Sequence, residues 1–266
     1  MFLQAIANNR HCEGAGDTFS VKSDWMDEQL TVSGQLHGEI GMSSLGKIYT
    51  FSPCFRAEKS TTKKHLSEFW MIEPEMAFYE LDETIKLAEK FVKGSIEHVI
   101  KKSQYEFTQL GIKDDFLKEI IEQDWIQLKY EQICSEFKVK FGDDISSDIE
   151  KKIVDKYKCP VFITHYPKDL KPFYMKKYDK VALCFDLIFP EVGELIGGSQ
   201  REEDYDILKQ SMIDGGLDLE KMDWYLSTRK YGSVKHSGFG MGMDRLLMFI
   251  TKSSKIHDVI PFPVSY

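Results

Sequence analysis

Hydrophobic and polar residues alternate with a period of two on both sides of a basic loop in residues 51–78, FSPCFRAEKSTTKKHLSEFWMIEPEMAF. Side chains of a strand point alternately to its two faces, so the pattern predicts two antiparallel strands joined by the loop. One face would be apolar and pack on the core: Phe51, Phe55, Ala57, Trp70, Ile72, Met76 and Phe78. The other would gather Arg56, Glu58, Phe69, Glu73 and Glu75. A plain amphipathic hairpin and a site that stacks a planar base and holds a phosphate explain this alternation equally well.

A helical period follows the hairpin. Over residues 83–111, apolar side chains recur every three to four residues, which predicts a helix packed on the core: Ile85, Leu87, Ala88, Phe91, Val92, Ile96, Val99 and Ile100. The charged segment that follows is interpreted as a helical insertion at about residues 112–158. Apolar, β-rich runs return at 159–167 and 181–189.

A single charge, Asp186, interrupts the apolar run 181–189. A carboxylate there is costly unless it is paired or opens onto a site, so Asp186 is a candidate functional residue. Glu194 and Arg201 follow, and strict alternation would place them on opposite faces of a strand. A bulge at Gly197-Gly198 would bring both to the same face.

Glycines alternate near the carboxyl end of the chain. Gly238, Gly240 and Gly242 fall on a predicted strand that turns directly into a helix. Removing side chains from one face lets a flat ligand lie against the backbone. Arg245 falls in the first helical turn, where the positive dipole end and a cation can both meet a phosphate. The spacing is not the GxGxxG of a dinucleotide site, and the lack of GK[ST] excludes a P-loop.

Composition narrows the class of protein. The chain has 266 residues and a formal net charge of −8, which argues against a generic basic nucleic-acid binder. Its 5 cysteines are scattered without a CxxC, which favours reduced thiols over a disulfide framework or a zinc site. No apolar run approaches the roughly 20 residues that span a bilayer, and no signal segment opens the chain. We therefore expect a cytoplasmic protein without membrane contact, or one of an organelle matrix.

Several ordered motifs together resemble one family. FRAE followed by HLSEF is similar to motif 2, and GFGMGMDRL to motif 3, of the catalytic domain of class II aminoacyl-tRNA synthetases of the aspartate/asparagine/lysine subgroup. TVSGQL, MIEPEMAF, YPKDLKPFYM, GELIGGSQRE and HDVIPFP resemble its asparagine-specific members in particular. The resemblance covers nearly the whole chain. It implies an α+β fold, a mainly antiparallel sheet flanked by helices, with residues 1–266 as one catalytic domain.

The resemblance also implies a reaction and its residues. L-Asparagine would be activated with ATP and Mg²⁺ to asparaginyl-adenylate and then transferred to the 3′ end of tRNA(Asn). The catalytic residues would be Arg56 on the α-phosphate, Glu194 on Mg²⁺, and Arg245, which stacks on adenine opposite Phe69. The whole ATP-binding set would be Arg56, Glu58, His65, Leu66, Phe69, Glu194, Gly242, Asp244 and Arg245. The amino-acid-binding set would be Glu13, Ser33, Gln35, Glu73, Asp186 and Arg201. Lys63 and Lys64, in the hairpin loop, would contact the tRNA acceptor end.

The choice of amino acid follows from charge. Gly38 stands where the aspartate-specific pattern has lysine, and Glu73 stands where it has aspartate. A less positive pocket favours a neutral carboxamide, since an unpaired buried charge is expensive. Three alternatives remain open: an aspartyl-tRNA synthetase, a synthetase-like asparagine synthetase that transfers to ammonia, and a synthetase-derived binding protein without catalysis. The presence of Arg56, Glu194 and Arg245 argues against the last.

Three features depart from the family pattern. The sequence lacks most of motif 1, which forms the dimer interface of the family. It also lacks an N-terminal anticodon-binding barrel, usually ~100 residues. It ends in FPVSY where many relatives have FPR. We therefore expect a catalytic domain that is partial at its N-terminus, from a full-length protein that forms a homodimer.

Overall fold

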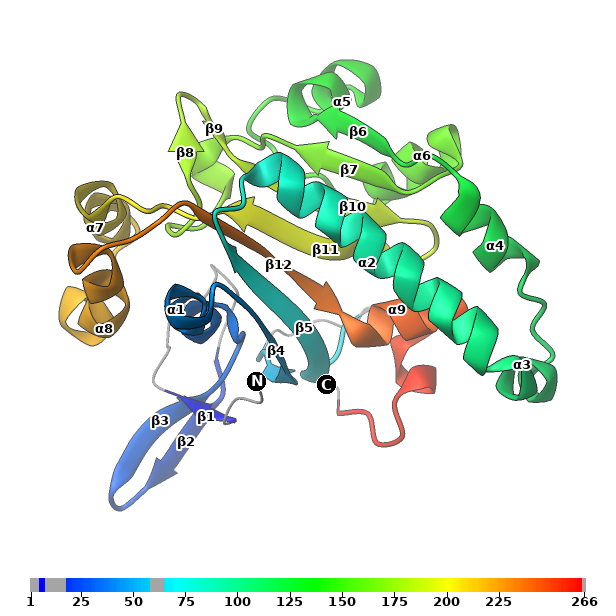
Figure 1. The fold of residues 1–266 in the computed structure, drawn as a ribbon, viewed down its shortest axis with the longest axis horizontal. Coiled ribbons are helices and arrows are strands. Elements are labelled where there is room, and N and C mark those ends of the chain that lie inside the picture. Colours follow the sequence, from blue (N-terminus) through cyan, green and yellow to red (C-terminus); the bar gives the residue numbers. More distant parts are fainter. Residues whose placement is uncertain (1–4, 8–17, 58–64, 265–266) are drawn as a thin grey trace.

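A computed structural model describes residues 5–7, 18–57 and 65–264. Its centre is a seven-stranded sheet in the order β4-β5-β12-β11-β10-β7-β6 (Figure 1). Neighbouring strands are antiparallel except β6 and β7, which are parallel. The expected α+β fold with a mainly antiparallel sheet is confirmed. The strands are β4 (Lys47–Phe55), β5 (Glu68–Ala77), β6 (Ile126–Lys129), β7 (Val161–Thr164), β10 (Cys184–Phe189), β11 (Gly193–Gln200) and β12 (His236–Gly242).

Smaller sheets and the helices surround this centre. Strands β1 (Ile6–Ala7), β2 (Ser20–Ser23) and β3 (Met26–Leu30) form one small sheet, and β8 (Lys177–Tyr178) pairs with β9 (Val181–Ala182). The helices are α1 (Gln35–Leu45), α2 (Leu81–Lys102), α3 (Gln104–Leu110), α4 (Asp115–Glu122), α5 (Tyr130–Phe137), α6 (Ser147–Tyr157), α7 (Tyr205–Asp214), α8 (Leu219–Lys230) and α9 (Met243–Ile250). Two short 3-10 helices are η1 (Lys168–Leu170) and η2 (Ile256–Val259). In the described part of the chain, no helix combines the length and the apolarity that crossing a membrane requires.

Period-two alternation in β10 divides the core between the two faces of the sheet. Phe185 and Leu187 pack on one face together with α2, which lies across the sheet (Figure 1). Cys184 and Ile188 pack on the other face, with residues of α1, α5, α6, α7 and α8. The predicted apolar side of helix α2 is confirmed, because Ile85, Ala88, Val92 and Ile96 are buried in the same cluster as Phe185 and Leu187. Asp186 therefore points to the second face, which carries the polar residues described below.

The prediction for the apolar face of the hairpin is wrong in part. Met76 is buried, but Trp70 is 38% exposed and Phe78 is 75% exposed. The carboxylates on the other face are more deeply buried, with Glu73 at 2% and Glu75 at 0% exposure. The reason is the position of the hairpin. It forms the edge of the sheet, whereas α2 packs mainly on β10, β11 and β12.

The segment 112–158 is not purely helical as expected. It contains α4, α5 and α6 but also strand β6, which extends the central sheet by parallel pairing with β7. β6 has four residues, IQLK, between charged helices. Periodicity over four residues is too short to separate a strand from a helical turn.

Candidate active site

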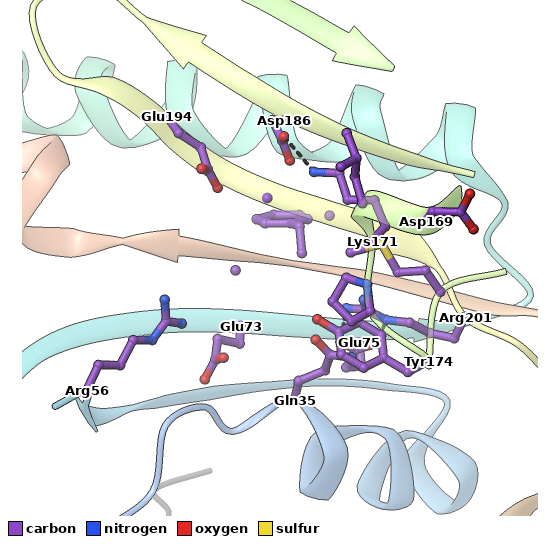
Figure 2. Close-up of a pocket in the computed structure, with 17 residues that line it drawn as sticks. Gln35, Arg56, Glu73, Glu75, Asp169, Lys171, Tyr174, Asp186, Glu194 and Arg201 are labelled. Carbon is purple, nitrogen blue, oxygen red and sulfur yellow. Dashed lines mark hydrogen bonds and ion pairs between the residues drawn. The ribbon is translucent and has the colours of Figure 1, made fainter. Parts of the chain in front are cut away.

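The second face of the sheet bears a cleft made of two adjoining cavities, about 490 Å³ and about 590 Å³ in volume. The two cavities share Arg56, Glu194, Gly197 and Gly240, so they form one elongated site. Figure 2 shows its two walls: β5 and the start of α1 on one side, and β10, β11 and the segment after η1 on the other. We name the two ends the Arg201 end and the Arg245 end.

The Arg201 end is built around a buried ion pair. Arg201 Nη2 donates to Glu75 Oε1 at 2.6 Å, and Arg201 Nε donates to Glu75 Oε2 at 3.2 Å. Arg201 Nη1 donates to Ser199 Oγ at 2.7 Å. Burial raises the pKa of Glu75, and the guanidinium of Arg201 opposes that rise. Burial also disfavours the guanidinium, yet Glu75 keeps the pKa of Arg201 above its ordinary value. Both residues line the cleft.

One glycine of the alternating series makes room for this pair. A Cβ on Gly238 would lie 2.3 Å from the carboxylate of Glu75, which is closer than any side chain allows. The series was predicted to clear a face for a flat ligand. At Gly238 that interpretation is wrong, because the space is taken by the protein's own carboxylate. Gly240 and Gly242 do line the cleft.

Glu73 joins the hairpin to the turn before α1. It accepts hydrogen bonds from Gly34 N at 2.7 Å and Thr50 Oγ1 at 3.1 Å, and a short one from Ser33 Oγ. Glu73 lines the cleft, whereas Ser33 is fully buried and does not. Ser33, predicted to bind the amino acid, instead supports Glu73 and accepts from Gln35 N at 3.1 Å.

A network of buried charged and polar residues centred on Glu39 orients the side chain of Gln35. Its Nε2 donates to Glu39 Oε1 at 3.1 Å. Glu39 Oε2 accepts from Arg229 Nη2 at 2.5 Å and Tyr225 Oη at 2.8 Å, and lies 3.0 Å from His236 Nε2. Burial works against the charge, but Arg229 and His236 hold the pKa of Glu39 well below its usual range. The network thus links α1, α8 and β12 beneath the cleft.

A strand irregularity brings Glu194 and Arg201 to the same cleft. The pairing of β10 with β11 shifts between Leu187, opposite Ile196, and Ile188, opposite Glu194. Leu195 is therefore the extra residue, and it reverses the alternation between Glu194 and Gly197. The predicted outcome is confirmed, since both residues line one cavity. The predicted place, Gly197-Gly198, is wrong because the register between those glycines is regular.

Two carboxylates face each other across Gly197. A Cβ on Gly197 would lie 3.0 Å from Glu194 Oε1 and 3.6 Å from Asp186 Oδ1, so both oxygens border the same small space. Asp186 Oδ2 pairs with Lys171 Nζ at 2.8 Å, the ion pair drawn in Figure 2. Loss of hydration at the cleft wall and the charge of Asp186 raise the pKa of Glu194. The residue keeps contact with solvent in the cleft, which screens part of this effect.

The Arg245 end combines cations with an aromatic ring. The Arg56 guanidinium lies 5.2 Å from the centre of the Phe69 ring. Arg245 Nη1 donates to the backbone oxygen of Glu194. Asp244 accepts from Trp70 N at 2.9 Å and so ties α9 to β5. His65, Leu66, Phe69, Gly242, Asp244 and Arg245 all line this cavity, as the predicted nucleotide set requires.

The predicted residues thus divide into three groups. The cleft brings together Gln35, Arg56, His65, Leu66, Phe69, Glu73, Asp186, Glu194, Arg201, Gly242, Asp244 and Arg245. Ser33 lies behind it. Glu13, Glu58, Lys63 and Lys64 fall outside the described residues. Sequence reasoning missed Lys171 and Glu39, and gave Glu75 no role. The alternation of β5 did place Glu75 on the polar face, but Lys171 follows a short 3-10 helix with no periodic signal.

The two carboxylates suit one kind of metal ion. Among the described residues, no group of three or more His, Cys, Asp or Glu side chains is placed to hold a metal. Mg²⁺ is commonly held by one or two carboxylates together with substrate phosphates and water. Asp186 and Glu194 at the wall between the two cavities fit that pattern, and they do not form an all-protein cage.

Comparison with known proteins gives one consistent picture. The family model described as tRNA synthetases class II (D, K and N) matches residues 5–266. An asparagine–tRNA ligase of Desulfotalea psychrophila is 41% identical over 285 residues, covering 97% of this chain and 63% of that protein. One of Lactobacillus helveticus is 43% identical over 260 residues, covering 94% of this chain and 60% of that protein.

A solved structure agrees in fold over the whole chain. Asparaginyl-tRNA synthetase from Pyrococcus horikoshii, complexed with asparaginyl-adenylate, superposes with a TM-score of 0.93 at 34% identity. The match covers 100% of this chain and 63% of that one. The chain therefore spans less than two thirds of the length of these three relatives.

Proposed function

The chain belongs to the class II tRNA synthetases of the D, K and N family, and we propose that it activates L-asparagine with ATP and transfers it to tRNA. In the first step an asparagine carboxylate oxygen attacks the α-phosphorus of ATP. The bond to the β-phosphate bridging oxygen breaks, and asparaginyl-adenylate and pyrophosphate form. In the second step a hydroxyl of the terminal ribose of tRNA attacks the acyl carbon, and AMP leaves.

The observation that carries the proposal is the pairing of Arg201 with Glu75 beside Gly38. Among the residues that the structure describes, Glu75 and Ser199 take three of the five guanidinium N–H groups of Arg201, which leaves two for other acceptors. The pair is electrically balanced. A neutral carboxamide can accept from Arg201 without leaving a charge unpaired, whereas a carboxylate would add a net buried charge. The selection of asparagine over aspartate follows from this balance.

The α-ammonium group of the substrate has its own partner in the proposal. Glu39 accepts from Nε2 of Gln35, so the Oε1 oxygen of Gln35 is the atom left to accept from an ammonium group. This amide orientation is set by the hydrogen-bond network beneath the cleft. Gln35 and Arg201 would then hold opposite ends of asparagine and direct its carboxylate toward the Arg245 end.

The Arg245 end would hold the nucleotide. Adenine would lie between the Phe69 ring and Arg245, and Arg56 would bind the α-phosphate. Phosphoryl transfer depends mainly on positioning and charge neutralisation, so the site needs no protein base. Glu194 and Asp186 would hold Mg²⁺, which neutralises phosphate charge when bound. Each of these roles uses a residue that already lines the cleft.

We also propose that the protein acts as a homodimer through the hairpin edge. Tyr49, 55% exposed, and Trp70, 38% exposed, lie on the two strands of this edge. The Phe51 and Trp70 rings pack with their centres 5.0 Å apart. Aromatic residues grouped at a sheet edge are typical of a protein interface. Sedimentation equilibrium of the wild type and of Trp70→Glu tests the proposal. A dimer that the substitution dissociates would support it, and a monomeric wild type would contradict it.

ATP–pyrophosphate exchange tests the activity. The protein is supplied with asparagine or aspartate, and the product of each reaction is then offered tRNA or ammonia. We expect exchange with asparagine and charging of tRNA. Exchange driven by aspartate would show an aspartate-specific enzyme, and transfer to ammonia an asparagine synthetase. A folded protein without exchange under any of these conditions would contradict the proposal and favour a binding protein.

A further inference from the structure

Lys171 is a partly buried cation in the wall of the cleft, and the proposed reaction assigns it no role. Its side chain and that of Asp186 are each 15% exposed, and their charged atoms lie 2.8 Å apart. The ammonium group also lies 3.8 Å from the centre of the Tyr166 ring. Tyr166 is 2% exposed, so Lys171 is held from two sides in a partly dehydrated position.

The ion pair uses only one oxygen of Asp186. Lys171 bonds Oδ2, whereas Oδ1 borders the space beside Gly197 that Glu194 Oε1 also borders. Gly197 is what leaves this space open, because a Cβ there would lie 3.0 Å from Glu194 Oε1. Lys171 and the Tyr166 hydroxyl, which also hydrogen-bonds Asp186, together hold this carboxylate with Oδ1 at the space that Glu194 borders.

We propose that Lys171 is a built-in counter-ion for the carboxylates of Asp186 and Glu194, which positions Asp186 and keeps divalent cations from binding before the nucleotide. The inference rests on the proposed function for the identity of the cation. Lys171 offsets one of the two carboxylate charges, which leaves too little negative charge to retain a hydrated dication alone. The phosphates of ATP supply the missing negative charge and oxygen ligands, so cation and nucleotide enter together.

The alternative role for Lys171 is purely structural. A buried ion pair often contributes little net stability, because desolvation offsets the attraction. A lysine retained only for packing would leave cation affinity unchanged when its charge is removed. A counter-ion would not, because one unit of charge in a partly buried site changes the affinity for a nearby dication by about tenfold or more. Cation binding without nucleotide therefore separates the two roles.

The experiment measures Mn²⁺, a paramagnetic substitute for Mg²⁺, by the electron paramagnetic resonance signal of the free ion. The proteins are the wild type, Lys171→Met and Lys171→Gln, each without nucleotide. Lys171→Gln removes the charge but keeps a hydrogen-bond donor for Asp186, so it tests the same point if the methionine variant does not fold. We expect the affinity for Mn²⁺ to rise by about tenfold in both variants.

Three further variants act as controls. Lys171→Arg keeps the charge and should keep the weak binding of the wild type. Lys176→Met removes a lysine five positions away that pairs with Glu203 at 2.5 Å outside the cleft, and should change nothing. In the double variant Lys171→Gln/Asp186→Asn the gain should disappear, because the second carboxylate is gone.

Two results would overturn the inference. One is an affinity for Mn²⁺ that is the same in Lys171→Gln as in the wild type. The other is tight, stoichiometric binding of Mn²⁺ by the wild type without nucleotide. Neither result bears on pyrophosphate exchange by the wild type, so failure of this inference and failure of the proposed activity are distinguishable.

Discussion

The arginines at the two ends of the cleft differ in their burial and in the groups that they contact. At the Arg201 end the cations meet carboxylates inside the protein: Arg201 pairs with Glu75 at 2.6 Å, and Arg229 pairs with Glu39 at 2.5 Å. All four of these residues are buried. At the Arg245 end, Arg56 lies over the ring of Phe69, and Arg245 donates to a backbone oxygen. Both arginines keep partial contact with solvent.

The difference matches what each end would bind. Buried pairs balance charge before a ligand arrives, so a site built from them discriminates against ligands that add a charge. Arginines that keep partial contact with solvent in the cleft can offer their charge to an anion such as a polyphosphate. Loss of a residue at the Arg201 end should therefore reduce folding stability and activity together. Loss of a partly exposed arginine at the Arg245 end should reduce activity alone.

The strongest test of this contrast is Arg201→Ala. Removing one partner of a buried pair leaves Glu75 uncompensated at 0% exposure, which should lower the free energy of unfolding by about 3–5 kcal/mol. Asparagine-dependent exchange should vanish in the same variant. Urea unfolding followed by circular dichroism measures the first effect. Lys235→Ala breaks an exposed ion pair with Glu80 and should have a much smaller effect on stability, because solvent screens such a pair. Equal losses in both variants would refute the contrast.

Arg56→Ala tests the Arg245 end. Loss of a cation that neutralises phosphate should lower kcat/KM for ATP by about 10²–10³-fold. The free energy of unfolding should change by less than about 1 kcal/mol, because Arg56 is only partly buried. Lys252→Ala is a matched control, since Lys252 lies 3.9 Å from the centre of the Phe116 ring outside the cleft. A large loss of stability in Arg56→Ala would show that folding depends on the cations of this end as well.

Local sequence patterns predicted which residues line the cleft better than they predicted the ion pairs between those residues. Alternation along β5 placed Phe69, Glu73 and Glu75 on one face, because period-two geometry depends on neighbouring residues only. The pairing of Glu75 with Arg201 joins residues 126 positions apart and depends on β12 lying between β5 and β11. No local pattern contains that order. The Arg201 end, made of such pairs, was accordingly the less predictable half of the site.

The β-bulge at Leu195 shows a second limit of prediction from sequence. Two adjacent glycines were the natural sequence signal for an irregular strand, yet the irregularity falls at Leu195. Gly198 serves a different purpose, because a Cβ there would lie 2.5 Å from the Phe185 ring and close packing in the core therefore requires glycine. A glycine in a strand indicates close approach of some kind, and only the folded neighbours decide whether a bulge, a side chain or a ligand approaches.

The pH dependence of folding stability in Glu39→Gln tests whether the buried charges beneath the Arg201 end stabilise the fold. Because the folded pKa of Glu39 lies well below its ordinary value of 4.5, its carboxylate adds stability that is present above about pH 5 and is lost as pH falls through the folded pKa. At about pH 7 the variant should lose about 2 kcal/mol, since charged hydrogen bonds to Arg229, Tyr225 and His236 weaken. The difference in unfolding free energy between the variant and the wild type should narrow below about pH 4.

Thermal unfolding of the wild type and of Glu39→Gln, followed from about pH 7 down to about pH 3, measures this difference in stability. A gap that stays constant down to about pH 3 would contradict the assignment of a depressed pKa to Glu39. Asp218→Asn is a useful control because Asp218 accepts from backbone N–H groups at the exposed start of α8. Its effect should be the smaller of the two at every pH.

The smallest expected effect concerns Gly38, which under the proposed function would decide how well the Arg201 end excludes a charged substrate. A Cβ there would lie 3.3 Å from Cγ of Glu75, so a side chain at this position reaches the buried pair from α1. Gly38→Lys would bring a cation to Glu75 and give the pocket a net positive charge. We expect the ratio of aspartate- to asparagine-dependent exchange to rise by about tenfold, the size of a difference of about 1.4 kcal/mol. Ser44→Lys places the same charge on an exposed position of α1 and should leave the ratio unchanged. If Gly38→Lys left it unchanged as well, the balance of Arg201 and Glu75 would not set the choice of amino acid, and the contrast between the two ends would concern stability only.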